Sequence, residues 1–254
     1  MSDTTFSQTD WENYARSYDG LNALAPYRAL LAEVKKKLHI TPGERILEAA
    51  CGTGNLTKLL CDASNAHAAD MPNIEAVDYS TEMLARAQEK CDTRAHIQKV
   101  DLNKQLPYKS GCFDAIVSVN TLYALENPEA VLKEFARLLT HQGRLILVTP
   151  KEDYQNGLIL KAHCKSTKPD VYWENMHASA EREIMLINEA CTDSSTALSL
   201  RTIAACNRDI NANHAFHFFN RKSLRDIAKR VGFSVHYHGE TYAKQCHLMV
   251  LHKV

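Results

Sequence analysis

The chain has 254 residues, of which 45% are hydrophobic and 24% are charged, and this composition excludes a disordered or collagen-like chain. Lysine plus arginine number 30 and aspartate plus glutamate number 30, so no overall field favours nucleic acid or an anionic membrane. We therefore expect a small-molecule partner, no nucleic acid, and one α/β domain.

The first part of the chain predicts helices and then strands that alternate with helices. Residues 11–19 have helical character, and an amphipathic helix is expected over 27–38, before Thr41-Pro42-Gly43. Strands are predicted over 45–49, 74–77, 96–100, 113–119 and 144–149, with helices over 54–63, 81–90 behind a Ser80 cap, and 128–139. This alternation is typical of βαβ units in a largely parallel sheet.

The pattern changes after Pro150. Residues 151–220 hold no convincing strand but several helical stretches, so we expect a helical insertion there. A helix over 221–231 and two strands over 233–238 and 246–253 follow, and the strands should pair as an antiparallel hairpin at the sheet edge. We expect one domain over 1–254, divided into N-terminal helices at 1–40, a core at 41–150, an insertion at 151–220, and a helix with a hairpin at 221–254.

The start of the chain lacks the basic and apolar regions of a signal peptide, and no later run approaches the roughly 18 apolar residues of a membrane span. A cytoplasmic protein is therefore expected. The 8 cysteines are scattered without a Cys-x-x-Cys pair or a Cys/His cluster, which predicts reduced thiols and no metal site.

The most informative stretch is Glu48-Ala-Ala50-Cys-Gly52-Thr-Gly54, in which a strand runs into a Gly-x-Gly turn that opens a helix. Asp78 ends the next strand, where a carboxylate can accept both hydroxyls of a ribose. A dinucleotide site would place a third small residue at position 57, which is Thr57 here, and Glu48 would repel a pyrophosphate. These features favour S-adenosylmethionine.

The run around Glu48 resembles the first motif of class I S-adenosylmethionine-dependent methyltransferases, which commonly ends Cys-Gly-Thr-Gly. Further similarity lies in Val77-Asp78-Tyr79-Ser80-x-x-Met83, Val100-Asp101-Leu102, Cys112-Phe-Asp-Ala-Ile-Val-Ser, and the segment from Asn127 to Leu147. The small-molecule members, of types 11 and 25, are the most similar. The resemblance implies a Rossmann-like, seven-stranded, mostly parallel sheet with an antiparallel C-terminal hairpin, helices on both faces and a helical lid.

The resemblance also implies a role for each matched residue. Glu48 would stand near the amino group of the methionine moiety, Gly52 and Gly54 would let the turn run against it, and Asn120 would lie beside the methionine end and the acceptor. Asp78 with Tyr79 would hold the ribose, Met83 would pack on the adenine, and Asp101 with the Leu102 backbone would read the adenine edge. Ala50 replaces the family's usual glycine, so cofactor affinity depends on how a methyl group is accommodated there.

Residues outside the core are candidates for the remaining roles. Tyr14 and Tyr18 resemble a Tyr-x-x-x-Tyr-Asp element that closes over the cofactor in some members, and plain packing on the sheet is the alternative. For a general base, the candidates are His214, His217 and Tyr123, with His177 in the insertion as a further histidine.

The sequence thus predicts methyl transfer to the O, N or C atom of a small-molecule acceptor by in-line displacement, with S-adenosylhomocysteine as the product. Such a reaction needs an acceptor held in line with the methyl group and no covalent nucleophile. The alternative is a non-catalytic or non-methylating protein that binds S-adenosylmethionine on the same fold.

Overall fold

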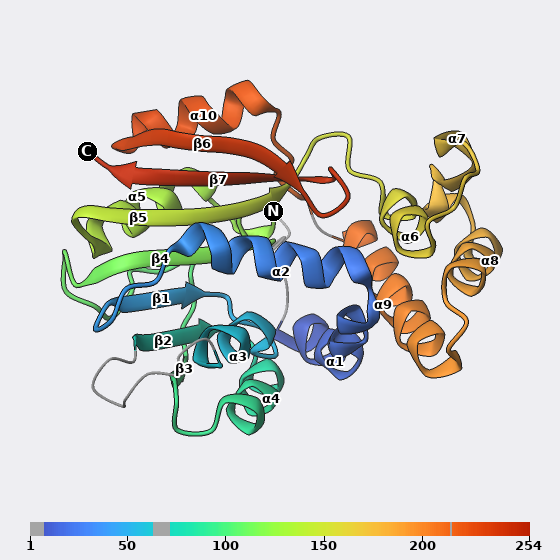
Figure 1. Cartoon of the computed structure of the whole chain (residues 1–254), viewed down its shortest axis with the longest axis horizontal. Helices are drawn as coiled ribbons and strands as arrows, with labels where there is room; N and C mark the ends of the chain where they lie inside the picture. Colours follow the sequence, from blue (N-terminus) through green and yellow to red (C-terminus); the bar gives the residue numbers. More distant parts are fainter. Residues whose placement is uncertain (1–7, 63–71, 214) are drawn as a thin grey trace.

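The structure is a computed structural model that describes residues 8–62, 72–213 and 215–254. Within these residues, seven strands form one sheet in the order β3-β2-β1-β4-β5-β7-β6 (Figure 1). The strands are β1 (Arg45–Ala49), β2 (Asn73–Asp78), β3 (His96–Lys99), β4 (Phe113–Val119), β5 (Leu139–Pro150), β6 (Phe233–Thr241) and β7 (Cys246–Lys253). The strands β1 to β5 pair in parallel, whereas β7 is antiparallel to both β5 and β6. The predicted fold class is confirmed.

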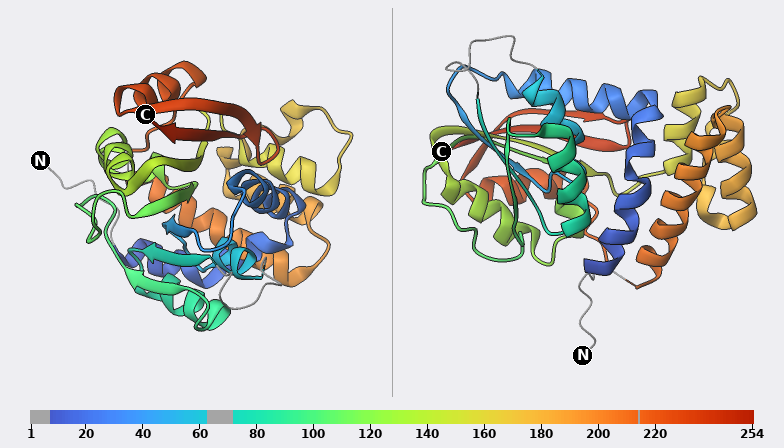
Figure 2. Two further views of the ribbon diagram at one scale, coloured as in Figure 1. Left: turned by 60° about the vertical axis from the view of Figure 1, so that its left-hand side comes forward. Right: turned by 90° about the horizontal axis from the view of Figure 1, so that it is seen from below.

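Helices cover both faces of this sheet (Figures 1 and 2). The helices α2 (Ala25–Leu38), α3 (Asn55–Cys61) and α4 (Thr81–Cys91) pack on one face. The helices α5 (Pro128–Leu138) and α10 (Arg221–Arg230) pack on the other. The sheet is therefore enclosed between two apolar layers, which is why its strands read as apolar runs in the sequence.

The central strand β4 contributes side chains to both apolar layers. In β4, Ala115 and Val117 contribute to the layer beneath α2, while Ile116 between them contributes to the layer beneath α5, and all three are fully buried. Successive side chains of a strand point to opposite faces, so a strand buried on both sides needs apolar residues at every position.

Most predicted boundaries agree with the structure to within two residues, and the largest difference is in β5. This strand begins at Leu139, whereas the apolar run starts only at Arg144. Leu139 pairs with Phe113, and the register shifts before Ala115 pairs with Arg144. The intervening His141 and Gln142 are exposed, so periodicity could not identify them as strand residues.

Residues 151–220 form the predicted helical insertion, here called the lid. It consists of α6 (Asn156–Cys164), α7 (Asp170–Trp173), the 3-10 turn η4 (Met176–Ala178), α8 (Ala180–Ala190) and α9 (Ser194–Asn213). Figure 2 shows these helices beyond the carboxyl ends of the parallel strands, with α1 (Gln8–Tyr18) alongside α9. The lid and the N-terminal segment therefore enclose that edge of the sheet together.

The 3-10 turn η1 (Asp19–Ala23) joins α1 to α2 and approaches α9 closely. A β-carbon at Gly20 would lie 2.4 Å from the Ser199 Cβ on α9. Only glycine lets the two backbones come this near without displacing the lid.

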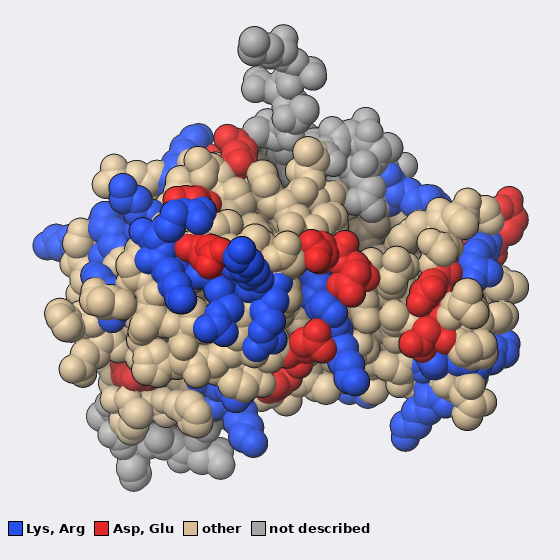
Figure 3. Space-filling view, turned by 90° about the horizontal axis from the view of Figure 1, so that it is seen from above, with Lys and Arg blue, Asp and Glu red and all other residues tan. Residues whose placement is uncertain are grey.

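Charged side chains of both signs occupy the surface seen from the side of α10 and β6 (Figure 3). The basic residues of α10 face outward while Leu224 and Ala228 are buried against the sheet, and Arg230 pairs with Glu129 of α5 at 2.7 Å. No helix in the described part of the chain is long and apolar enough to cross a membrane.

Candidate active site

The glycine-rich turn after β1 is built from residues with left-handed backbone conformation. Ala50, Gly52 and Gly54 have φ values of 62°, 54° and 77°. Glycine adopts these values without steric cost, but the alanine Cβ makes them unfavourable by about 1–2 kcal/mol. The sequence predicts that the Ala50 methyl group affects cofactor affinity, and the structure adds that this methyl group also makes the backbone conformation of the turn less favourable.

Glu48 lies at the end of β1, directly before this turn, and its side chain is only 4% exposed. Its Oε2 accepts a hydrogen bond of 2.7 Å from the Thr57 hydroxyl on α3. Burial raises the pKa of the Glu48 carboxyl to about 8, with a smaller contribution in the same direction from Asp78. A cationic group beside Glu48 would reverse this effect, because it favours the ionised carboxylate.

Asp78 ends β2 next to the turn, since β1 and β2 are parallel neighbours. Its Oδ2 accepts from the Gly52 N–H and its Oδ1 from the Ser80 N–H, both at 2.9 Å. Burial nevertheless raises the pKa of this carboxyl above its usual value. Each carboxylate oxygen has a further lone pair, so Asp78 can hold the turn and still accept two ligand hydroxyls.

Met83 and Tyr18, which are far apart in the sequence, both lie close to Gly52 of the turn. A β-carbon at Gly52 would lie 3.9 Å from Met83 Sδ and 3.8 Å from Tyr18 Cε1. Met83 is buried in the first turn of α4, whose cap is Ser80 as predicted. Tyr79 is 38% exposed and has the Lys99 ammonium 5.5 Å from its ring centroid.

Asp101 and Leu102 follow β3 at the same edge of the sheet. The Asp101 Oδ1 accepts from the Asn103 N–H at 3.0 Å, which shapes a tight turn, and Leu102 is buried. Asp101 thus has a structural role in this turn, and its second carboxylate oxygen pairs with Lys104 at 3.3 Å.

Asn120 directly follows β4 with a φ of 51°, a left-handed conformation that asparagine tolerates better than most residues. Its N–H donates to the Val148 carbonyl at 2.9 Å, and its Oδ1 accepts from the Cys246 thiol at 3.5 Å. The residue after β4 is therefore fixed against β5 and β7, with its amide at the edge that carries Glu48 and Asp78.

Two of the three candidate bases, Tyr123 and His217, lie close together in the described structure. Tyr123 follows Asn120 and stacks on Phe216, with ring centroids 5.0 Å apart, and burial raises its pKa to about 12. His217 is exposed, and its backbone N–H donates to the Tyr123 carbonyl at 2.8 Å. His214 lies outside the described residues.

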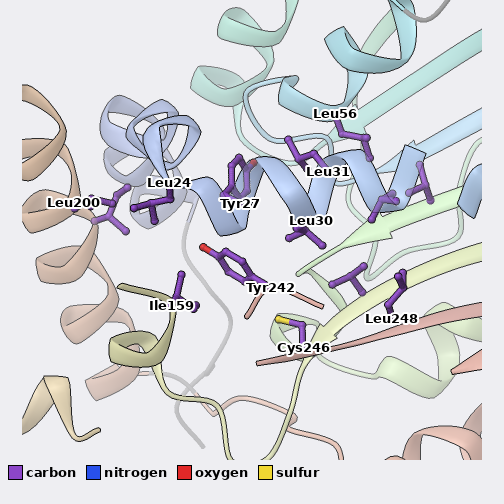
Figure 4. Close-up of a cluster of buried hydrophobic side chains, with 14 of the residues drawn as sticks. Leu24, Tyr27, Leu30, Leu31, Leu56, Ile159, Leu200, Tyr242, Cys246 and Leu248 are labelled. Atoms are coloured by element: carbon purple, nitrogen blue, oxygen red, sulfur yellow. The ribbon is translucent and has the colours of Figure 1, made fainter. Parts of the chain in front are cut away.

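A row of tyrosines connects the N-terminal segment to the hairpin. The centroid distances are 5.4 Å from Tyr14 to Tyr18, 6.5 Å from Tyr18 to Tyr27 and 6.2 Å from Tyr27 to Tyr242. Figure 4 shows Tyr27 on α2 facing Tyr242 from the turn between β6 and β7. Burial raises the pKa values of all four hydroxyls, which keeps them as neutral hydrogen-bonding groups.

The sequence did not reveal how the N-terminal segment is attached to the turn. The Lys90 ammonium of α4 donates to Asp19 Oδ1 at 2.5 Å, to Thr53 Oγ1 at 3.0 Å and to Asn55 Oδ1 at 2.8 Å. Asn55 also accepts from the Asn22 amide at 2.9 Å. These residues come from four separate elements, so no local pattern could have grouped them.

Comparisons with known proteins show similarity to methyltransferases over the part of the chain that holds these residues. A family model described as "Methyltransferase domain" matches residues 47–147, which include the glycine-rich turn, Asp78, Asp101 and β4. A demethylmenaquinone methyltransferase of Bacillus licheniformis is 26% identical over 151 residues, which cover 58% of this chain and 63% of that protein. A squalestatin tetraketide synthase of Cochliobolus lunatus is 30% identical over 152 residues, which cover 57% of this chain and 6% of that protein.

Among solved structures, a SAM-dependent methyltransferase from Aquifex aeolicus aligns over 98% of this chain and 100% of its own, with a TM-score of 0.59 and 16% identity. This similarity defines the class of fold, a Rossmann-like methyltransferase fold. Together with the family match, it shows that residues 47–147 are similar to a methyltransferase domain and that the chain has the fold that S-adenosylmethionine-dependent methyltransferases adopt. The chain spans less than two thirds of the length of each of the two curated relatives.

The residues at the carboxyl edge suit this cofactor. A side chain at Gly52 would contact Met83 and Tyr18, the buried Glu48 carboxyl directly precedes the turn, and the partly buried Asp78 carboxyl accepts from the Gly52 N–H. Burial raises the pKa values of both carboxyls, and the hydrogen bonds that each accepts within the described residues come from uncharged groups. Carboxyls in such surroundings suit a ligand that brings hydroxyls and an ammonium group.

Proposed function

We propose that the protein transfers a methyl group from S-adenosylmethionine to a small-molecule acceptor by in-line displacement. The observation that carries this proposal is the pair of carboxyls beside a left-handed glycine turn, the buried Glu48 and the partly buried Asp78. When bound, the cofactor supplies an electrophilic methyl group. The chain's own residues need only hold the two reactants in line and exclude water.

In this proposal Glu48 holds the ammonium group of the methionine end and Asp78 holds the ribose hydroxyls. Ala50, Gly52 and Gly54 form the turn against which the ligand lies. Met83 and Leu102 contact the adenine, Asp101 reads its edge, and Tyr79 lies over the ribose. Asn120, Tyr14 and Tyr18 enclose the methionine end.

The acceptor approaches from the side of the lid, because the lid and α1 cover the carboxyl ends of the strands. Tyr123 is placed to donate a hydrogen bond, since a pKa of about 12 keeps its hydroxyl protonated at neutral pH. In the proposal, His214 and His217 remain the histidines from which a base would come if the acceptor must lose a proton.

Calorimetric titration with S-adenosylhomocysteine tests cofactor binding. Asp78→Ala should weaken binding about 5- to 150-fold, because the loss of hydrogen bonds to a charged group costs about 1–3 kcal/mol. The matched control is Asp114→Ala, which removes a carboxylate that accepts from the Arg45 N–H at 2.9 Å at the opposite edge of the sheet. Equal affinities for the two variants would remove Asp78 from the site.

Transfer itself is tested with S-adenosylmethionine labelled in the methyl group and a panel of phenols, quinols, amines and carbon acids. Label in an acceptor supports methyl transfer. Tight binding of S-adenosylhomocysteine without label in any product would favour the alternative, a non-methylating protein on this fold.

A further inference from the structure

An ammonium group is fixed beside the glycine-rich turn by residues to which the proposed function gives no role. Lys90 lies in the last turn of α4, and its Nζ donates to Asp19 Oδ1 at 2.5 Å, to Thr53 Oγ1 at 3.0 Å and to Asn55 Oδ1 at 2.8 Å. An ammonium group has three N–H donors, so every donor of Lys90 has a partner and its charge is held in one place.

The partners of Lys90 come from both the N-terminal segment and the turn. Thr53 lies between Gly52 and Gly54 and is fully buried, and its hydroxyl donates to Asp19 Oδ1 at 2.6 Å while it accepts from Lys90. Asp19 begins η1, and α1, which directly precedes it, packs against α4 (Figure 1). The carboxylate, the hydroxyl and the ammonium group therefore contact one another directly at the turn.

Helix stabilisation and surface pairing do not explain where this pair of charges lies. A cation in the last turn of a helix complements the helix dipole, but it does so equally well from solvent. An exposed ion pair contributes little to stability, as expected for Lys58 and Asp62 at the end of α3, whose side chains are 48% and 44% exposed. The side chains of Lys90 and Asp19 are only 22% and 35% exposed, and both contact the buried hydroxyl of the turn. Their position indicates a role at the turn itself.

The Lys90 ammonium is close enough to the turn to act on the charge of a ligand there. Its Nζ lies 3.0 Å from the Thr53 hydroxyl, and consecutive Cα atoms are about 3.8 Å apart, so it lies within about 10 Å of the Gly52 Cα. The Debye length in 0.1 M salt is also about 10 Å, so the field of an unpaired ammonium would extend to the turn. The Asp19 carboxylate, in direct contact with the ammonium, cancels most of this field.

The charge beside the turn matters because the proposed cofactor and its product differ in charge. S-adenosylmethionine carries a sulfonium group, whereas the sulfur of S-adenosylhomocysteine is a neutral thioether. The two ligands share the nucleoside and the amino acid end, so they differ by one methyl group and one positive charge. A cation without its carboxylate beside the site would therefore weaken binding of the cofactor more than binding of the product.

We propose that Asp19 is a specificity-determining residue that acts through Lys90. Its carboxylate cancels the charge of the ammonium beside the turn and thereby favours the cationic cofactor relative to its neutral product. Lys90 is a positioning residue that joins η1 to Thr53 and Asn55 of the turn. This inference rests on the proposed function, because it concerns the ligand of the same site.

Calorimetric titrations with S-adenosylmethionine and with S-adenosylhomocysteine, made without an acceptor, measure the ratio of the two dissociation constants. Asp19→Asn keeps the shape of the side chain and removes its charge. At low salt this variant should weaken binding of S-adenosylmethionine about threefold to tenfold relative to S-adenosylhomocysteine, the effect of one unpaired charge at this distance. Lys90→Gln leaves the Asp19 carboxylate unpaired and should shift the ratio in the opposite direction. The double variant has neither charge and should return to the wild-type ratio.

Asp62→Asn and Lys58→Gln are matched controls, because they remove the charges of the exposed pair at the end of α3 and should keep the wild-type ratio. In 1 M salt the Debye length falls to about 3 Å, so the ratio for Asp19→Asn should return toward the wild-type value. Equal weakening of both ligands in Asp19→Asn, or a shifted ratio that does not depend on salt, would leave the pair a structural role only and overturn the proposal.

The same titrations separate this proposal from the proposed function. Wild-type protein that binds neither ligand refutes both. If wild-type protein binds both ligands and every variant keeps its ratio, only the role of Asp19 is wrong. If Asp19→Asn binds neither ligand, Lys90→Gln decides, and an unchanged ratio there overturns the proposal. If the ratios shift as expected but no acceptor is methylated, the role of Asp19 stands and the proposed methyl transfer fails.

Discussion

Replacement of Glu48 by glutamine tests the proposed role of the first buried carboxyl through pH. In the free protein this carboxyl has a pKa of about 8, so it carries a proton at neutral pH. In the complex, the ammonium group of the ligand favours the ionised form and lowers the pKa toward its ordinary value. Binding must therefore release a proton at pH values between the ordinary pKa of a glutamate, about 4.3, and about 8.

The size of the effect follows from the fraction of free protein that is already ionised. With a pKa of about 8 this fraction is about one half at pH 8 and about one hundredth at pH 6, so affinity should rise about 50-fold across that range. Glutamine resembles the protonated acid and cannot ionise. Glu48→Gln should accordingly bind more weakly at pH 8 and show a flat profile.

Calorimetry with S-adenosylhomocysteine at several pH values, each in two buffers of different ionisation enthalpy, measures both the affinity and the number of protons released. The matched ligand is 5′-methylthioadenosine, which has the nucleoside but no amino acid end and should bind with little pH dependence. A pH slope that is the same for both ligands, or that persists in Glu48→Gln, would refute this account of Glu48.

Three further predictions concern stability. Ala50→Gly should raise the free energy of unfolding in urea by about 0.5–1 kcal/mol, because the steric strain that it removes at a φ of 62° exceeds the cost of the added chain entropy of glycine. A loss of stability would show that Ala50 is not strained. Gly157→Ala should lower the free energy of unfolding by about 2 kcal/mol or more, because the new Cβ would lie 1.7 Å from the Trp173 carbonyl oxygen. An unchanged melting temperature would show instead that α6 and α7 can separate freely. Burial, with a smaller effect from the nearby Arg221, lowers the pKa of His238 from 6.5 to about 4. Because the folded protein disfavours the protonated ring, the free energy of unfolding is about 3 kcal/mol higher above pH 6.5 than in acid, and this difference is lost as the pH falls toward 4. Urea titrations from pH 4 to 7 should show a smaller acid loss for His238→Gln than for wild-type protein, whereas exposed His141→Gln should match wild type.

Those parts of the fold that follow from local periodicity were predictable. The apolar run of β4, the Ser80 cap of α4 and the limits of α10 to within one residue each depend on neighbouring residues, and the structure agrees with each. The carboxyl edge was also predictable, because Glu48 and Asp78 end adjacent parallel strands and must meet there. Their contact through the Gly52 N–H is a consequence of that register.

Other features depend on which distant segments meet. The Tyr242 ring reaches Tyr27 only because the hairpin folds back beside β5, and the sequence around it contains no motif. The sequence around Glu183 is typical of an amphipathic helix with an exposed charged face, but in the structure Glu183 is buried between His177 and Arg208. Burial of a charge is decided by its partners, which local patterns do not reveal.

The contacts of Lys90 have a consequence for any shortened form of this chain. Its ammonium group is anchored by Asp19 on one side and by Thr53 and Asn55 of the glycine turn on the other. A protein that began at α2 would retain the complete family motif but would leave this cation beside the turn without its carboxylate. If the proposed cofactor site is correct, we expect the minimal unit able to bind the nucleoside to be larger than the matched residues 47–147.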